Sequence, residues 1–123
     1  MVTIAYAVHV GPDGTERIPA RSYLESEEVS TSDHAYLRHL FLMLGETGRI
    51  NNQRKFRKER GPIWAFKVRQ LRIGAFQVGR VWFLTHGFSK KQDRWRREEL
   101  ERAETIRSGH LAWMGHRRRA LER

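Results

Sequence analysis

Four cationic side chains lie inside the most strand-like part of this sequence. The stretch from Ile63 to Lys91 is dense in β-branched and aromatic residues, a composition typical of strands. Its internal cations are Lys67, Arg69, Arg72 and Arg80, and the pair Lys90 and Lys91 ends it. Ammonium groups attract phosphate, and a guanidinium group also matches its geometry with two parallel hydrogen bonds. The stretch therefore predicts a sheet that binds phosphate.

A second group of cations precedes these strands. Between Arg49 and Arg60, six basic residues accompany one acidic residue, Glu59. The basic residues are Arg49, Arg54, Lys55, Arg57, Lys58 and Arg60. This connector is either a solvated linker or the lip of an anion-binding groove, and the cations that follow in the strands favour the groove.

His86 is the histidine of the predicted strands, and it lies close to the lysine pair. An imidazole can give or take a proton near neutral pH, which suits an acid or a base. The alternative is a histidine packed beside Trp82 on one face of the sheet. Trp64 and Trp82 could stack on nucleic-acid bases or pack in the hydrophobic core, and we favour packing in the core.

Other kinds of chemistry are excluded or unsupported. The chain has no cysteine, so it has no disulfide and no thiolate metal site. His34 and His39 are five residues apart, and His110 and His116 are six apart; neither spacing places two ligands on one face of a helix. No phosphate-binding or dinucleotide-binding glycine motif is present. We therefore expect neither a metal nor a cofactor.

The overall charge points to an anionic partner. Lys and Arg number 24 against 14 Asp and Glu, which gives a net charge of +10. Such an excess suits nucleic acid, an anionic membrane or an acidic protein. The N-terminus lacks a signal pattern, and no apolar run reaches the length of about 18 residues that a membrane span needs. We expect a cytoplasmic protein without a membrane partner.

The elements that must position these residues fit one domain of 123 residues. We expect a strand over Val2–Val10, a short helix that begins near Pro19 and runs through Tyr23 and Leu24, and a helix whose start is Ser30–Asp33. That helix carries an apolar stripe and ends at Gly45 and Gly48. Its stripe consists of Tyr36, Leu37, Leu40, Phe41 and Leu44.

Three strands and a helix complete the predicted order. The strands are expected over Trp64–Val68, Leu71–Val78 and Arg80–Phe88, with a hairpin at Gly79 and the last strand central in the sheet. Asp93 is the predicted cap of the final helix, which Ser108 and Gly109 should interrupt. A basic extension then begins at about residue 108 and contains Arg117, Arg118 and Arg119.

Several segments resemble one protein family. Leu71-Arg72-Ile73 resembles the Tyr-Arg-Ile/Val segment of RelE/ParE-superfamily toxins, and the segment from Val81 to Lys91 is similar to a strand of the phage-derived HigB-like branch that ends in His-Gly-Phe-x-Lys-Lys. Glu99 and Ala103 match the start of that branch's last helix, and the run from Gly45 to Lys67 resembles the branch's segment that leads into and includes its first strand after the helices. Two positions depart from the family: Ala65 stands where Glu is usual, and Lys67 stands where Arg is usual.

The resemblance implies a small RelE-like α+β domain with the order β-α-α-β-β-β-α and an antiparallel-rich sheet that has its helices on one face. It also implies a toxin of a type II toxin–antitoxin pair. Many such toxins cut messenger RNA on the ribosome, whereas the ParE relatives act on DNA gyrase. The expected partners are a cognate acidic antitoxin of the helix-turn-helix type, the ribosome and mRNA.

Cleavage of RNA without a metal needs a base, an acid and cations that hold the phosphate. Arg72 is the expected phosphate clamp, assisted by Lys67 and Arg69. Lys67 or Lys55 can serve as the base because neighbouring cations disfavour the charged form of a lysine. His86 and Lys91 complete the predicted catalytic set. The predicted RNA-binding residues are Arg54, Lys55, Lys58, Arg69 and Lys90. A gyrase-binding toxin and a nucleic-acid-binding module without catalysis remain alternatives.

Overall fold

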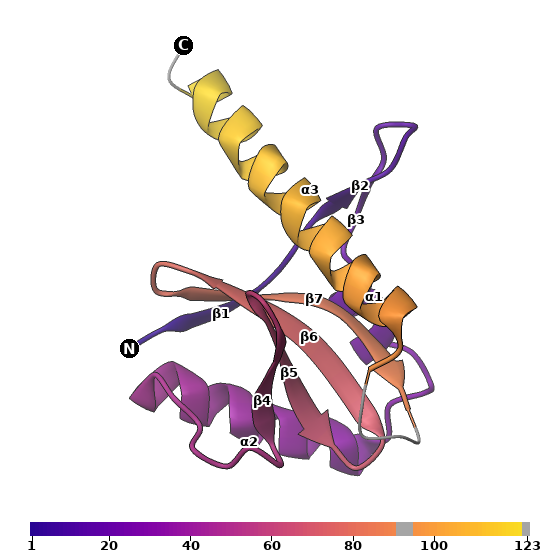
Figure 1. Cartoon of the computed structure of the whole chain (residues 1–123), viewed down its shortest axis with the longest axis vertical. Coiled ribbons are helices and arrows are strands. Elements are labelled where there is room, and N and C mark those ends of the chain that lie inside the picture. The colour runs from indigo at the N-terminus through magenta and orange to yellow at the C-terminus, as the bar shows by residue number, and fades with distance from the viewer. Residues whose placement is uncertain (91–94, 122–123) are drawn as a thin grey trace.

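The computed structural model describes residues 1–90 and 95–121, and it contains a five-stranded sheet with helices beside it (Figure 1). The order of the strands is β1-β7-β6-β5-β4; β1 runs parallel to β7, and the other neighbours are antiparallel. The strands are β1 (Thr3–Tyr6), β4 (Phe56–Arg60), β5 (Ile63–Val68), β6 (Leu71–Val78) and β7 (Val81–Ser89). The predicted α+β class and antiparallel-rich sheet are confirmed; β7, expected to be central, is an interior strand between β1 and β6, and β6 is the middle strand.

Two short turns connect the three longest strands. Gly79 has a φ of 58° in the turn between β6 and β7, the left-handed conformation that glycine adopts without strain. Arg69 has a φ of 53° in the turn between β5 and β6, where a non-glycine residue is uncommon. The sequence has no glycine, proline, asparagine or aspartate there, and the structure shows that an arginine turns the chain.

The helix before these strands begins as predicted and ends at Gly48, the second of the two glycines predicted to end it. The helix α2 (Thr31–Thr47) is capped by Ser30, whose hydroxyl accepts a hydrogen bond of 3.2 Å from the backbone N–H of Asp33. The expectation that Gly45 ends it is wrong, because Gly45 is helical and Gly48 is the left-handed cap, with a φ of 79°. The short helix α1 (Pro19–Leu24) has proline at its start, as expected.

Helices cover both faces of the sheet, so the expected placement on one face is wrong. Side chains alternate between the two faces along a strand. Phe66 and Ile73 belong to the core cluster that contains the buried leucines of α1 and α2. Ala65 and Phe76 belong to a second cluster, which contains Ala103 and Ile106 of α3 (Arg97–Leu121). We call these two surfaces the α2 face and the α3 face.

The final helix is continuous where an interruption was expected. α3 runs through Ser108 and Gly109 to Leu121, so the basic extension is helical (Figure 1). A glycine inside a helix costs only about 1 kcal/mol relative to alanine. Buried Ile106 and His110 lie on either side of Gly109, and their packing offsets that cost. The predicted cap Asp93 lies outside the described residues.

The N-terminal strand is shorter than expected, because the chain leaves the sheet after Ala7. Two very short strands, β2 (His9–Val10) and β3 (Glu16–Arg17), then form a hairpin beside α3 (Figure 1). The backbone N–H of Val8 donates to Nδ1 of His110 at 2.9 Å, and the indole N–H of Trp113 donates to Glu16 at 2.9 Å. The hairpin therefore packs against the C-terminal half of α3.

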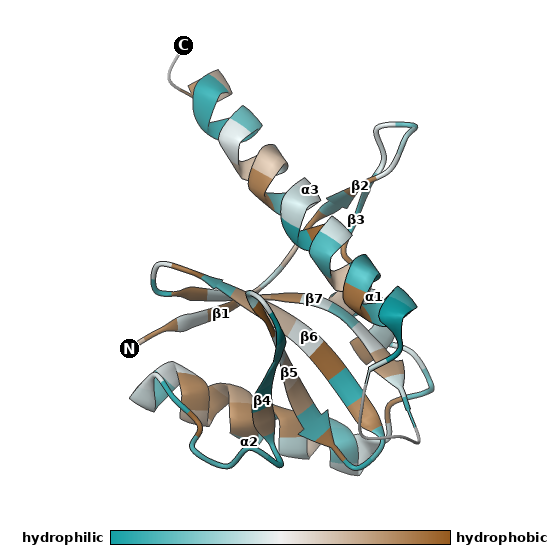
Figure 2. Ribbon diagram, viewed as in Figure 1, coloured by the Kyte–Doolittle hydropathy of each residue, from teal (hydrophilic) through white to brown (hydrophobic). Residues whose placement is uncertain are grey.

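The basic connector contains an edge strand that the sequence analysis missed. β4 lies within it and pairs with β5. Figure 2 draws most of β4 in teal, because four of its five residues are charged. Charged side chains are typical of an exposed sheet edge, since they discourage pairing with other chains. The second half of the connector is thus part of the sheet, whereas residues 49–55 lie outside the strands.

Candidate functional site

Lys67 and Arg72 lie side by side on the α3 face. The register of β5 and β6 places Lys67 directly opposite Arg72, and residues directly opposite each other share a face. The alternation from Ala65 to Lys67 assigns this face to α3. In β7, Phe88 lies opposite Arg72. The two cations that the sequence predicted for phosphate binding are therefore neighbours.

A β-bulge brings His86 to the same face. The register of β6 and β7 shifts between Ile73 and Ala75, so that Thr85 and His86 together lie opposite Gly74. The ring of His86 stacks on Phe88 at 5.3 Å and meets Trp95 edge to face at 6.0 Å. Arg72 and His86 lie on adjacent strands, and such diagonal neighbours are about 7–8 Å apart.

Trp95 covers this part of the sheet. A Cβ atom on Gly74 would collide with the Thr85 hydroxyl and would lie 3.1 Å from the Trp95 ring. Glycine at position 74 therefore lets the indole approach the backbone of β6. The sequence analysis did not select Trp95, and a glycine inside a strand next to an aromatic-rich segment is the signal that could have found it.

His86 is buried and neutral in this arrangement. Its side chain is 1% exposed, and burial lowers its pKa to about 3, with a smaller contribution from Arg102. Its Nε2 atom lies 3.7 Å from a carboxylate oxygen of Glu99 at the start of α3. Since the imidazole is neutral at pH 7, this contact is not an ion pair there. On its other side, Nδ1 of the ring lies 3.2 Å from the hydroxyl of Thr85 and forms a hydrogen bond with it.

Glu99 is the more accessible member of this pair. Its side chain is 21% exposed, and burial raises its pKa above the ordinary value of a glutamate. A raised pKa brings a carboxyl group closer to the operating pH, as general acid–base catalysis requires. The sequence analysis matched Glu99 to a family helix but gave it no chemical role. The structure adds it to the site.

Arg72 combines burial with a structural role. Its side chain is 6% exposed, and Nη1 donates to the carbonyl oxygens of Arg69 at 2.6 Å and Leu71 at 2.9 Å. These bonds hold the turn in which Arg69 adopts its positive φ. The guanidinium is therefore fixed in place before any substrate binds. Lys67 beside it is half-buried.

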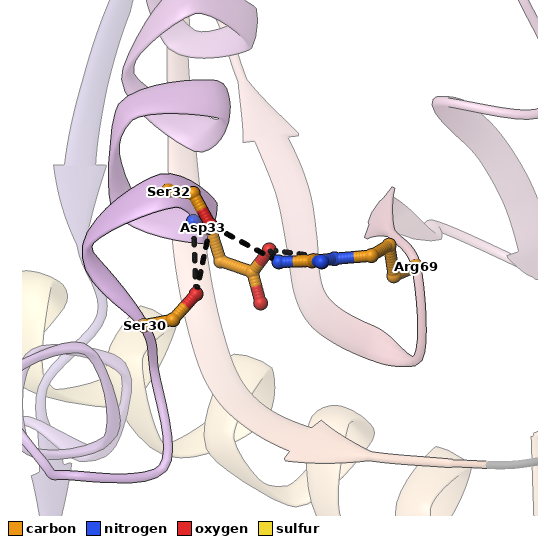
Figure 3. A network of polar contacts seen from close by, with 4 residues as sticks. All are labelled: Ser30, Ser32, Asp33 and Arg69. Atoms are coloured by element: carbon orange, nitrogen blue, oxygen red, sulfur yellow. Dashed lines mark hydrogen bonds and ion pairs between the residues drawn. The ribbon is translucent and has the colours of Figure 1, made fainter.

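Arg69 points away from these two residues. Its Nε donates to Oδ1 of Asp33 at 3.0 Å, and its Nη2 donates to the hydroxyl of Ser32 at 3.1 Å (Figure 3). Both partners lie in the first turn of α2, beside the cap residue Ser30. The predicted phosphate-binding residue Arg69 thus links a turn of the sheet to a helix start, and it does not join Lys67 and Arg72.

The other predicted RNA-binding residues are dispersed. Lys58 lies opposite Trp64, which packs against the core of the α2 face. The ammonium of Lys55 lies 4.5 Å from the centre of the Tyr36 ring, on α2. Arg54 is exposed in the turn before β4, and the backbone N–H of Lys90 donates to the carbonyl of Gln70 at 2.8 Å. Lys91, a predicted catalytic residue, lies outside the described residues.

Arg57 is a cation of the α3 face that the sequence analysis placed only within the connector. It lies opposite Ala65, two residues along β5 from Lys67, and it forms an ion pair with Glu59 at 3.3 Å. Arg57, Lys67 and Arg72 thus form a row of cations across β4, β5 and β6, which we call the cation row. Such a row can hold phosphate oxygens from several directions.

Comparison with known proteins adds no assignment. No protein-family model matches the chain, and no curated protein sequence matches it. Within residues 1–90 and 95–121, no group of three histidine, cysteine, aspartate or glutamate side chains is arranged to hold a metal ion. In the same residues, no helix has both the length and the apolar character needed to cross a membrane.

Proposed function

We propose that this protein is the toxin of a type II toxin–antitoxin pair and cleaves messenger RNA on the ribosome without a metal. The observation that carries the proposal is the juxtaposition of Lys67, Arg72 and His86 on one face of the sheet. The sequence resemblance suggests RNA cleavage as the activity. RNA cleavage needs cations and a proton-transfer group close together, and these residues share the α3 face. The RelE-like topology and a cytoplasmic location belong to the same proposal.

In this mechanism the cation row binds the scissile phosphate. Arg72 and Lys67 neutralise the charge that builds on the phosphate oxygens as the 2′-oxygen attacks. A base takes the proton of the 2′-hydroxyl, the bond from phosphorus to the 5′-oxygen breaks, and an acid gives a proton to that oxygen. The products are a 2′,3′-cyclic phosphate and a 5′-hydroxyl end.

Glu99 is the group that we assign to removal of the 2′-hydroxyl proton. It supplies the carboxylate that the family usually has at position 65, where this chain has alanine. His86 acts from behind it, because its Nε2 atom lies 3.7 Å from the carboxylate and limits where that group can lie. Lys67, which the sequence suggested as a base, is assigned here to protonation of the 5′-oxygen, because it lies directly opposite Arg72 in the cation row. Contact between His86 and substrate would require Trp95 to move.

The test compares two lysines of the sheet, half-buried Lys67 on the α3 face and exposed Lys58 on the α2 face. Purified protein is added to a translation extract with a reporter mRNA, and new 5′ ends are mapped by primer extension. Lys67→Ala should lower the cleavage rate at least about 100-fold, which corresponds to about 2.7 kcal/mol of transition-state stabilisation. Lys58→Ala removes the same charge from the α2 face and should cleave at the wild-type rate. Intact mRNA with wild-type protein, or equal loss in both variants, would refute the proposal.

A second candidate function is binding to DNA gyrase. The observation that favours it is the burial of Arg72 and His86, which leaves few accessible catalytic groups. In that case the protein would cause gyrase-dependent DNA breaks and leave RNA intact. Either toxin would have a cognate acidic antitoxin, whose negative charge complements the net charge of +10. Co-expression with the product of an adjacent reading frame would then restore growth.

A further inference from the structure

An apolar groove lies between the edge strand β1 and α2, away from the cation row. Its volume is about 430 Å³, and its walls are mainly apolar. The N-terminal strand region contributes Val2, Ile4 and Tyr6, and α2 contributes Phe41, Leu42 and Gly45. β1 has a strand partner on one side only, so its outer row of backbone groups borders the groove.

The rim of this groove carries large apolar side chains in contact with solvent. Leu42 is 57% exposed and Tyr6 is 38% exposed. Single exposed apolar residues are common, but these two share one groove with Met1, which is 93% exposed. An apolar patch beside an exposed strand edge is a surface that proteins usually cover.

The charges of the groove make it complementary to itself. Arg38 and Glu46 also line it, both exposed, and each is four residues from Leu42 along α2. Residues four apart lie on the same face of a helix, about 6 Å apart along its axis. Arg38, Leu42 and Glu46 therefore form an exposed stripe along α2, with a cation at one end, a carboxylate at the other and Leu42 midway between them.

A two-fold axis that passes beside Leu42 would place each residue of this stripe against a complementary residue of a second copy. In an isologous interface every contact between two different residues occurs twice, so antiparallel α2 helices would place Arg38 of each copy against Glu46 of the other. The two Leu42 side chains would meet at the axis and enter the facing grooves. We infer that this protein forms a homodimer through α2 and the groove beside β1.

Other occupants fit the groove less well. Nucleic acid prefers the cation row to an apolar surface that carries a carboxylate. An acidic peptide would be repelled by Glu46, and a small apolar ligand would leave Leu42 and both charges exposed. A second copy satisfies the apolar and the charged positions together.

The net charge of +10 on each chain opposes pairing over long distances. Salt screens this repulsion, with a Debye length of about 8 Å at physiological ionic strength. The dimer should therefore be measured at that ionic strength or slightly above. The groove has no residue in common with the cation row, so this inference can fail without affecting the proposed nuclease, and the reverse is also true.

The test is a charge exchange measured by sedimentation velocity on the full chain at micromolar concentrations. Wild type should sediment as a dimer. Arg38→Glu alone and Glu46→Arg alone should each weaken the dimer about tenfold or more, because two attractive pairs become two repulsive pairs. A mixture of the two variants should restore dimers. In the mixed dimer, the two carboxylates of the Arg38→Glu chain face the two guanidinium groups of the Glu46→Arg chain, so both pairs are attractive again.

Two further variants test whether the effects are specific to this surface. Arg21→Glu makes the same charge change on exposed α1 and should leave the dimer intact. Leu42→Asp changes an exposed side chain and should give a folded monomer, as checked by circular dichroism. A monomeric wild type, single variants that dimerise like wild type, or a mixture that stays monomeric would each overturn the inference.

Discussion

The burial of His86 predicts a specific loss of stability in mild acid. The pKa of this histidine is about 3 in the folded protein, against an ordinary value of 6.5. Between these two pH values the unfolded chain binds a proton at this residue and the folded chain does not. Stability is therefore fully present above pH 6.5 and falls as the pH falls toward 3.

The magnitude follows from the same two values. Each pH unit in this interval changes the free energy of unfolding by about 1.4 kcal/mol, and the whole interval by about 5 kcal/mol. Glu99 acts in the opposite direction, because its folded pKa is raised and its contribution is lost as the pH rises. His110 has a lowered pKa caused by burial and acts in the same direction as His86. A variant that removes only His86 separates these effects.

The assay is urea-induced unfolding of wild type and His86→Gln at a series of pH values from about 4 to 7. Glutamine is polar and does not titrate, while Glu99 and His110 remain in both proteins. The free energy of unfolding of wild type should rise more steeply with pH, by about 1.4 kcal/mol per pH unit. Equal slopes for wild type and His86→Gln would refute the buried, neutral histidine.

Two further predictions concern glycine and arginine positions. Gly74→Ala should destabilise the protein by about 1–3 kcal/mol, because the added methyl group would collide with Thr85 and press on Trp95. Gly115→Ala in α3 meets open space and should stabilise the protein by about 0.5–1 kcal/mol. Chemical denaturation of both variants is the measurement, and a Gly74→Ala protein as stable as wild type would contradict the packing of Trp95. The second concerns Arg117, Arg118 and Arg119 near the end of α3. Replacing all three by Gln should weaken binding to single-stranded RNA, and it should reduce the slope of log affinity against log salt concentration by up to about 2. Fluorescence anisotropy measures both, and an unchanged slope would show that the end of α3 makes no phosphate contacts.

Elements with a strong local signal could be predicted from the sequence. The start of α2 has a capping hydroxyl at Ser30, and the β6–β7 hairpin has Gly79 at its turn. These features depend on neighbours in the chain. β4 was missed because four of its five residues are charged, a pattern that also describes a solvated linker. Only its pairing with β5, which no local pattern encodes, makes it a strand.

Tertiary packing also explains why two glycines that were predicted to end or interrupt helices, Gly45 and Gly109, lie inside them. Gly45 is a common helix end, yet its carbonyl accepts a hydrogen bond of 2.9 Å from the backbone N–H of Val2, which ties the helix to the N-terminal strand. Gly109 lies between residues of α3 that are buried against the rest of the protein. In both cases a favourable long-range contact exceeds a local cost of about 1 kcal/mol.

The candidate site shows most clearly what strand periodicity misses. Simple alternation in β7 would place His86 on the same face as Trp82 and Leu84, toward α2. The bulge opposite Gly74 inserts one residue, which turns His86 to the α3 face, and Gly87 then faces the ring of Tyr23. The side chains of Lys67, Arg72 and His86 share a face only because of this single extra residue.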